Sequence, residues 1–339
     1  MKLKTPRWWY ARPGSHLPVG STLLRPVSWI WSAATARRIA KGKPIDPGAP
    51  VICVGNLTVG GAGKTPVVRE IVRRLRAHGV EAQVLTRGHG GALNGPVLVD
   101  RRTHASAEVG DEPLMLAKDF PVWVSRDRAA GAIAAAERGA QVIVLDDGHQ
   151  NPSLAKALSL IVVDGETRNG EWPFGDGAVI PAGPMREPLA KGLARADAVV
   201  ILLPPGVAQA DPQLLALFVA KPVLIARLRP DAPPPVEPQI GFAGIGKPWK
   251  FERALTDAGC RLIEFVPFPD HGTYDDKILE ALQTRARLSG AGLITTEKDW
   301  VRLPKAWQDR VTAWPVRAHF EDEARLDQLL ESVGLRPLA

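Results

Sequence analysis

Short apolar runs recur along the first two thirds of the chain, and polar or turn-forming residues bound each of them. They cover residues 51–55, 82–86, 141–145, 158–163 and 198–203. Strands that are buried on both faces of a parallel sheet have this composition. Between them lie stretches with helical character, such as 66–77. The alternation predicts an α/β fold with a doubly wound parallel sheet, in which loops at the C-terminal ends of the strands form the site.

Prolines interrupt every regular pattern between Pro230 and Pro238, and we interpret this segment as a linker between domains. Beyond it, strand and helix patterns resume on a smaller scale. The last predicted strand covers 311–316, and a final helix covers 321–332. The sequence therefore predicts a main domain over 50–229, a linker over 230–238 and a smaller C-terminal α/β domain over 239–339.

The first apolar run leads directly into a glycine-rich turn and a helix, and reads VICVGNLTVGGAGKT from Val51 to Thr65. Strand, glycine-rich loop, Gly-Lys-Thr and helix in this order are the context of a P-loop, as in P-loop NTPases. Lys64 can reach the terminal phosphates of a nucleotide, and the Thr65 hydroxyl can ligate Mg²⁺. A glycine-rich turn with a solvated lysine is the alternative, which the flanking strand and helix disfavour. The predicted nucleotide-binding residues are Thr58, Val59, Gly60, Gly61, Ala62, Gly63, Lys64 and Thr65, with Thr58 in the place of the usual first glycine.

A second signal follows the apolar run at 141–145, where the chain continues with Asp146 and Asp147. An apolar strand that ends in acidic residues is typical of a Walker B element, whose carboxylate holds Mg²⁺ directly or through water. A turn capped by aspartate is the alternative. Because a P-loop lies upstream in the same series of strands and helices, we predict that Asp146 and Asp147 are metal residues.

Net charge and composition indicate which classes of molecule the protein can bind. The net charge of +7 and the sequence pI of about 9.6 indicate an anionic partner, such as nucleic acid, a membrane surface or a phosphorylated substrate. We recognise no groove-reading module, so nucleic acid is not expected. The two cysteines form no C-x-x-C pair, and we see neither a signal peptide nor an apolar stretch long enough to span a bilayer. A cytosolic protein, or one held at the cytosolic face of a membrane, is predicted.

Aromatic and basic residues alternate in the segment before the P-loop domain, residues 1–49. The aromatic and apolar positions are Trp8, Trp9, Tyr10, Trp29, Ile30 and Trp31, and arginines and lysines lie among them. Such residues favour the boundary between water and an anionic membrane, which predicts an interfacial segment. The alternative is that the aromatic side chains dock this segment onto the core of the protein, and both can hold together.

A series of motifs resembles one known family. In chain order they are GNLTVGGAGKTP, GDEP, LDDGHQ, PAGPMREP, GFAGIGKP, FPDH and TTEKDWVRL. They are similar to those of the tetraacyldisaccharide 4′-kinases, the membrane-associated lipid A kinases of Gram-negative bacteria. The resemblance implies transfer of the γ-phosphate of ATP, with Mg²⁺, to the 4′-hydroxyl of a tetraacylated glucosamine disaccharide 1-phosphate, which forms lipid IVA. It also implies work at the cytoplasmic face of the inner membrane, with no obligate protein partner.

The resemblance also implies roles for single residues. Asp111 is expected to be the catalytic carboxylate, assisted by His271 from the second domain and by Lys64 at the phosphates. Because a sugar hydroxyl does not ionise near neutral pH, a positioned carboxylate is a natural acceptor for its proton. Taken alone, Asp111 could equally be a first-turn acid of a helix, and His271 a structural loop histidine. The residues expected at the substrate or in the active-site loop are Glu112, Arg186 and Glu187.

The chain departs from the family pattern at two places. His89 follows Arg87-Gly88, where the family commonly has an aromatic residue, and His149 stands where the family tends to have an apolar one. We therefore assign no role to either histidine. A nucleotide switch or a metallochaperone-type NTPase is the alternative function. The spacing of Thr296-Glu297-Lys298-Asp299 does not suit a guanine reader, and the chain has no metal-delivery tract.

Overall fold

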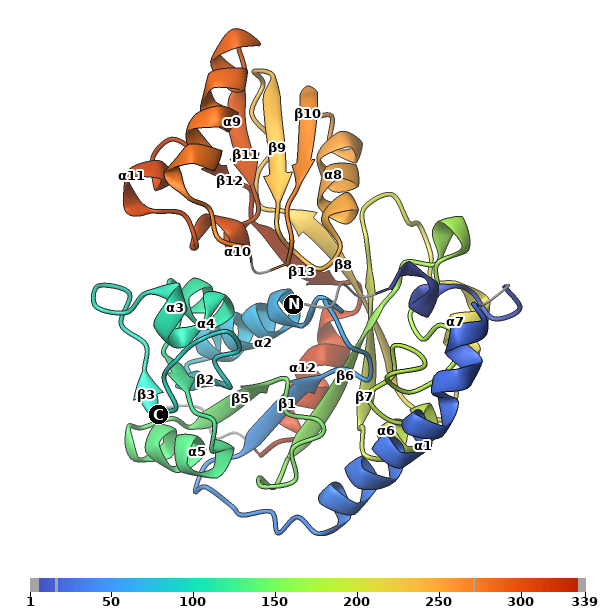
Figure 1. The fold of residues 1–339 in the computed structure, drawn as a ribbon. Helices are drawn as coiled ribbons and strands as arrows, with labels where there is room; N and C mark the ends of the chain where they lie inside the picture. Colours follow the sequence, from blue (N-terminus) through green and yellow to red (C-terminus); the bar gives the residue numbers. More distant parts are fainter. Residues whose placement is uncertain (1–5, 16–17, 271, 335–339) are drawn as a thin grey trace.

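The computed structural model describes residues 6–15, 18–270 and 272–334. Within them, nine strands form one sheet in the order β13-β8-β7-β6-β1-β5-β2-β4-β3. All neighbouring pairs are parallel except β13 with β8 and β3 with β4. This arrangement confirms the predicted doubly wound sheet (Figure 1). The strands are β1 Val51–Gly55, β2 Ala82–Thr86, β3 Val97–Leu98, β4 Val122–Val124, β5 Val142–Asp146, β6 Leu158–Asp164, β7 Ala198–Leu203, β8 Val223–Pro230 and β13 Val316–Phe320.

Helices cover both faces of this sheet because its central strands are apolar on both sides. On one face, Ile52 of β1 packs with Ile71 of the long helix that follows the P-loop. On the other face, Cys53 packs with Ala132 of an alanine-rich helix. The helices of this part are α1 Val19–Ala40, α2 Lys64–Ala77, α3 Ser106–Val109, α4 Asp111–Leu116, α5 Arg128–Glu137, α6 Leu189–Ala194, α7 Pro212–Ala216 and α12 Glu323–Glu331, with 3₁₀ turns η1 Arg7–Tyr10 and η2 Arg168–Gly170.

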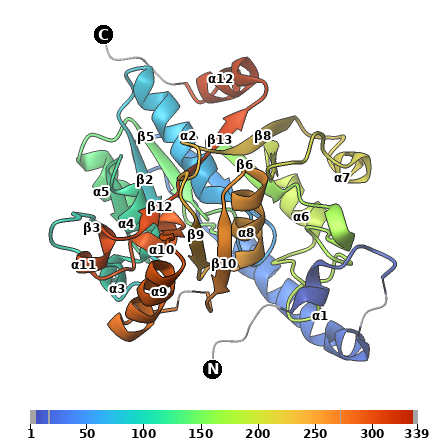
Figure 2. The same cartoon turned by 90° about the horizontal axis from the view of Figure 1, so that it is seen from above.

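The described part of the smaller domain has a parallel four-stranded sheet in the order β10-β9-β11-β12. Two helices, α8 and α9, flank this sheet on opposite sides, and Figure 2 shows them from above. In Figure 1 the smaller domain stands over α2 and α4 of the main domain, with α10 at the junction. Its elements are β9 Gln239–Ala243, α8 Pro248–Asp257, β10 Leu262–Pro267, α9 Asp276–Leu288, β11 Gly292–Thr295, α10 Glu297–Trp300, α11 Lys305–Gln308 and β12 Thr312–Ala313.

The end of the chain differs from the prediction. We expected one strand over 311–316, followed by a helix, both within a smaller domain over 239–339. Instead Trp314 and Pro315 separate β12, in the small sheet, from β13, which pairs antiparallel with β8 of the large sheet. Helix α12 then places Leu326 and Leu330 in the main core. The chain therefore passes between the domains twice, first into the smaller domain after β8 and then back into the main domain after β12. The second crossing occurs because the two parts of this apolar run pair in different sheets.

Helix α1 lies along the outside of the main domain (Figure 1). The Ser28 hydroxyl donates to the Val179 carbonyl at 2.6 Å and accepts from the Ala182 amide at 3.1 Å. Trp29 and Ile30 are 70% and 71% exposed, so the expectation that they dock onto the core is wrong for these two side chains. In the described part of the chain, no helix combines the length and the apolarity that are needed to cross a membrane.

Candidate active site

The P-loop connects β1 with α2, and its shape depends on glycines at two positions. Gly60 and Gly63 have positive φ values, +99° and +79°, which side chains rarely adopt. A Cβ on Gly63 would also lie 2.3 Å from Leu202 Cδ2. Thr58 has no such φ and forms an antiparallel bridge with Met185. Because that backbone is open to any residue, threonine can replace the usual glycine here.

Contacts from distant segments hold the start of the P-loop. The Tyr10 hydroxyl donates to the Val59 carbonyl, and the Val59 amide donates to the Pro184 carbonyl at 2.8 Å. Arg186 Nε donates to the Thr58 carbonyl at 2.9 Å. The sequence placed Arg186 in an active-site loop without indicating this contact, and it assigned Tyr10 to a membrane or docking segment. The Thr58 and Val59 carbonyls and the Val59 amide are thus bonded to protein groups, which fixes the start of the loop.

Asp147 is the centre of a charged cluster beside the loop. Arg186 forms a bidentate pair with its carboxylate at 2.7 and 3.0 Å, and Lys64 Nζ lies 3.6 Å from Oδ1. Burial alone would raise the pKa of Asp147, but Lys64 and Arg186 outweigh it and lower the pKa to about 2. The cluster keeps Asp147 ionised and holds the Lys64 side chain next to the loop.

Asp146, at the end of β5, has a different environment. It is 2% exposed, and its Oδ1 has no hydrogen-bond partner among the described residues. Burial and then the charge of Glu112 raise its pKa to about 7. A buried carboxylate oxygen without a partner fits a divalent cation or its bound water. Across 6–15, 18–270 and 272–334, no three His, Cys, Asp or Glu side chains are close enough to hold a metal on their own.

Glu187 lies in the predicted loop but is fully engaged inside the protein. Arg195 Nη2 lies 2.6 and 2.7 Å from its two oxygens, and Gln150 Nε2 donates to Oε1 at 3.0 Å. Gln150 Nε2 also donates to the Asn56 carbonyl. Glu187 therefore connects its own loop to Gln150, in the segment after β5. Both of its carboxylate oxygens are bonded to protein groups.

Asp111 and Glu112 occupy the first turn of α4, where the positive end of the helix dipole favours acids. Gly110 has a φ of +96°, and a Cβ there would lie 2.7 Å from the His89 carbonyl. Both acids meet cations from the smaller domain. Arg302 Nε lies 3.6 Å from Asp111 Oδ2, and Lys298 Nζ lies 3.2 Å from Glu112 Oε1. The predicted partner His271 lies outside the described residues.

A second contact between the domains closes the opposite side of the site. A Cβ on Gly246 would lie 4.0 Å from the Gly61 amide nitrogen, so the loop after β9 passes over the P-loop. Lys247 and Lys250 lie 3.2 and 2.6 Å from the carboxylate of Asp164, at the end of β6. Burial would raise the pKa of Asp164, but Lys250 and Lys247 lower it to about 2. Sequence reasoning missed these three residues, although Asp164 carries the available signal, an acid directly after a buried strand.

His149 is buried, with 1% of its surface exposed. Its Nε2 lies 3.0 Å from the Gly192 carbonyl, and its Nδ1 lies 3.0 Å from the Ser159 hydroxyl. Because a carbonyl only accepts, Nε2 carries the proton and Nδ1 accepts from Ser159. This histidine connects three segments beneath the site and does not face a phosphate.

Comparison with known proteins agrees with the motifs. A model of the tetraacyldisaccharide-1-P 4′-kinase family matches residues 20–334. The tetraacyldisaccharide 4′-kinase of Phenylobacterium zucineum (strain HLK1) is 68% identical over 330 residues, which cover 97% of this chain and 99% of that protein. The protein of the same name from Caulobacter vibrioides (strain NA1000 / CB15N) is 63% identical over 335 residues, which cover 99% of this chain and 100% of that protein.

A solved structure is similar along most of the chain. It is LpxK from Aquifex aeolicus, described as an "apo" form in complex with ATP. It matches with a TM-score of 0.71 at 26% identity, and the match covers 93% of this chain and 99% of that one. These findings confirm the family that the motif series predicted.

Proposed function

We propose that this chain, which belongs to the tetraacyldisaccharide-1-P 4′-kinase family, transfers the γ-phosphate of ATP to the 4′-hydroxyl of a tetraacylated glucosamine disaccharide 1-phosphate, forming lipid IVA. One observation carries the proposal. The phosphate-site cluster around Asp147 and the buried carboxylate of Asp111 lie at one edge of the large sheet, and the smaller domain contacts both sides of that edge. Family membership also decides against the alternative of a nucleotide switch or metallochaperone.

In this proposal the nucleotide side of the site is formed by residues of the main domain. The P-loop amides bind the phosphates of ATP, and Lys64 places its charge at the γ-phosphate. Asp146 and the Thr65 hydroxyl hold Mg²⁺, which when bound neutralises charge on the phosphate oxygens. Asp147 acts on the same site by holding Lys64 and Arg186 in place.

The acceptor side is formed where the two domains meet. Asp111 accepts the proton of the 4′-hydroxyl as the oxygen attacks phosphorus, and His271 orients or tunes that carboxylate. Glu112, one residue further along α4, is held by Lys298 and lies at the acceptor end of the site.

The direct test is transfer of labelled phosphate from ATP to a tetraacylated disaccharide 1-phosphate in detergent micelles. We expect label in the lipid with wild-type protein, and losses in Asp111→Ala and His271→Ala that affect turnover more than ATP affinity. If the two residues act as a unit, the double variant should be little worse than the poorer single variant. ATP turnover that does not depend on the acceptor would contradict the kinase assignment.

We further propose that α1 places the enzyme on the anionic, cytoplasmic surface of the inner membrane. Trp29 and Ile30 are among its most exposed apolar side chains, and Arg37 and Arg38 near its end are exposed cations. A basic residue near an anionic bilayer contributes about 1 kcal/mol, so a few of them together with aromatic side chains can hold a protein there. The acceptor is anchored in lipid, so this placement would bring it to the enzyme without extraction.

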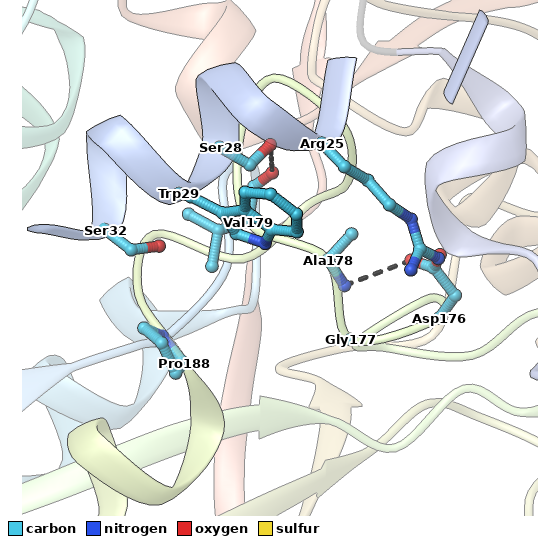
Figure 3. Close-up of a pocket in the computed structure, with 9 residues that line it drawn as sticks. All are labelled: Arg25, Ser28, Trp29, Ser32, Asp176, Gly177, Ala178, Val179 and Pro188. Atoms are coloured by element: carbon cyan, nitrogen blue, oxygen red, sulfur yellow. Dashed lines mark hydrogen bonds and ion pairs between the residues drawn. The ribbon is translucent and has the colours of Figure 1, made fainter. Parts of the chain in front are cut away.

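The contacts of α1 with the body of the protein leave its outer face available for this role. Figure 3 shows Arg25, Ser28, Trp29 and Ser32 of α1 beside residues 176–179, around a cavity of about 260 Å³. Arg25 lies 3.0 Å from Asp176 Oδ2 in an ion pair on this inner side. The helix is thereby held in place by polar contacts, while the side chain of Ile30 is exposed.

Co-sedimentation with phosphatidylglycerol vesicles tests the membrane proposal. Replacing the two exposed apolar residues in Trp29→Glu/Ile30→Glu should weaken binding, and added salt should weaken wild-type binding because it screens the charges. Leu288→Glu is the matched control, since Leu288 is 84% exposed but belongs to the smaller domain. Unchanged vesicle binding by the folded double variant would end this role for α1.

A further inference from the structure

Arg302 follows α10 and connects this helix with two loops at the C-terminal edge of the smaller sheet. Its side chain is 6% exposed. Nη1 donates to the Gly272 carbonyl at 3.0 Å, and Nη2 donates to the Gly244 carbonyl at 2.9 Å and pairs with Asp299. The two carbonyls lie in the loops that follow β10 and β9, and Asp299 belongs to α10. A single guanidinium therefore fixes the relative positions of these two loops and α10.

The residues that Arg302 contacts in the smaller domain are themselves held by hydrogen bonds. Asp299 is fully buried, and its Oδ1 accepts from the Tyr274 hydroxyl at 2.6 Å and from the Gly244 amide at 2.9 Å. Its other oxygen, Oδ2, accepts from the Thr296 hydroxyl at 2.6 Å. The Arg302 guanidinium also lies over the Tyr274 ring, 5.4 Å from its centroid. A buried polar network whose members are all bonded holds its side chains in one arrangement.

One side of the guanidinium faces the main domain. Arg302 Nε donates to the Lys298 carbonyl at 3.3 Å and also lies 3.6 Å from Asp111 Oδ2, within ion-pair distance of a side chain that is itself mostly buried. The Gly272 carbonyl, bonded to the other end of the same guanidinium, belongs to the residue directly after His271. Arg302 thus connects the loop of Gly272 in the smaller domain to the predicted catalytic carboxylate of the main domain.

We infer that Arg302 is a positioning residue for phosphate transfer, which holds Asp111 of the main domain against the loops of Gly244 and Gly272 in the smaller domain. The inference rests on the proposed function, because it needs Asp111 to be the proton acceptor. Arg302 acts through Asp111 and does not itself touch a reacting atom. Lysine cannot replace it, because one ammonium cannot reproduce the planar fork that serves several acceptors at once.

The test is a double-mutant cycle measured as kcat for labelled phosphate transfer. Arg302→Lys should lower kcat about 10- to 100-fold, the loss expected for a displacement of about 1 Å at a reacting pair. In an Asp111→Ala background the same substitution should have an effect of less than about twofold, because residues that act as a unit are non-additive. A general structural role would produce the same loss in both backgrounds.

Arg69→Lys is the matched control. Arg69 Nη1 lies 2.6 Å from Glu297 Oε2, so it also joins the main domain to α10, and it is buried to a similar degree. Among the described residues its ion-pair partners are Glu297 and Asp119, and neither Lys64 nor Asp111 is one of them, so whatever loss it produces should be the same with and without Asp111.

Each possible result of this cycle either supports the role of Arg302 or contradicts it. Wild-type kcat in Arg302→Lys, or equal losses in both backgrounds, would overturn it while leaving the kinase function intact. If Arg302→Lys does not fold, as judged by circular dichroism, Arg302→Gln enters the same cycle. No acceptor-dependent transfer by wild-type protein would overturn the proposed function itself, and the inference with it.

Discussion

Lowering the pH from 7 towards 4 should destabilise this fold through one buried side chain, His149. Burial, followed by the charge of Arg195, lowers the pKa of His149 to about 4. The imidazole is neutral in the folded protein, where it donates to the Gly192 carbonyl and accepts from the Ser159 hydroxyl. The folded state therefore resists protonation over a pH range in which an exposed histidine accepts a proton.

The size of the effect follows from proton linkage. An unfolded histidine has a pKa near 6.5, so between about pH 6.5 and 4 the unfolded chain binds more protons than the folded one. The free energy of unfolding must therefore fall as the pH falls from about 6.5 to 4. Above about pH 6.5 the contribution of His149 is fully retained. Since one pKa unit corresponds to about 1.4 kcal/mol, lowering the pKa from 6.5 to about 4 removes about 3 kcal/mol near pH 4.

The assay is urea unfolding at several pH values between 7.5 and 4.5 for wild type and His149→Phe. Phenylalanine resembles the apolar residue that the family tends to have here, and it cannot titrate. Its stability at pH 7.5 can differ from wild type, but the decline of its unfolding free energy with acid should be smaller. His78→Gln is the control, because His78 is an exposed surface residue at the end of α2. Parallel curves for wild type and His149→Phe would refute the assignment of the acid effect to His149.

Other predictions concern the nucleotide site. Lys64→Ala should reduce phosphate transfer at least about 100-fold by removing charge from the transferring group, and near-normal turnover would contradict its role. Asp146→Asn should raise the Mg²⁺ concentration needed for half-maximal rate more than Asp147→Asn, since only Asp146 has a carboxylate oxygen without a protein partner; equal titrations would refute this difference. Gly63→Ala should weaken ATP binding in calorimetry, because its φ of +79° and the nearby Leu202 leave no room for a methyl group, and wild-type affinity would show that the loop adapts.

Two strands of the large sheet and the glycine positions of the P-loop could be predicted from the sequence. The apolar runs at 51–55 and 198–203 predicted β1 and β7 with the bounds that the structure has, because a strand buried on both faces needs apolar residues at every position. The P-loop was readable for a similar reason, since positive φ at Gly60 and Gly63 requires residues without a side chain. The order of the motifs then identified the family.

Only the tertiary structure decided how distant segments meet. Asp164 and Lys247 are 83 residues apart, and Arg186 reaches the Thr58 carbonyl across 128 residues, yet nothing in either local sequence marks its partner. Nothing local marks Asp111 and Arg302 as partners either. Likewise, the sequence around β13 does not show that this strand pairs with β8 in the large sheet, while the residues just before it pair in the small sheet. An ion pair or a strand pair depends on where folding places both partners, whereas a buried strand or a glycine turn depends on the residues themselves.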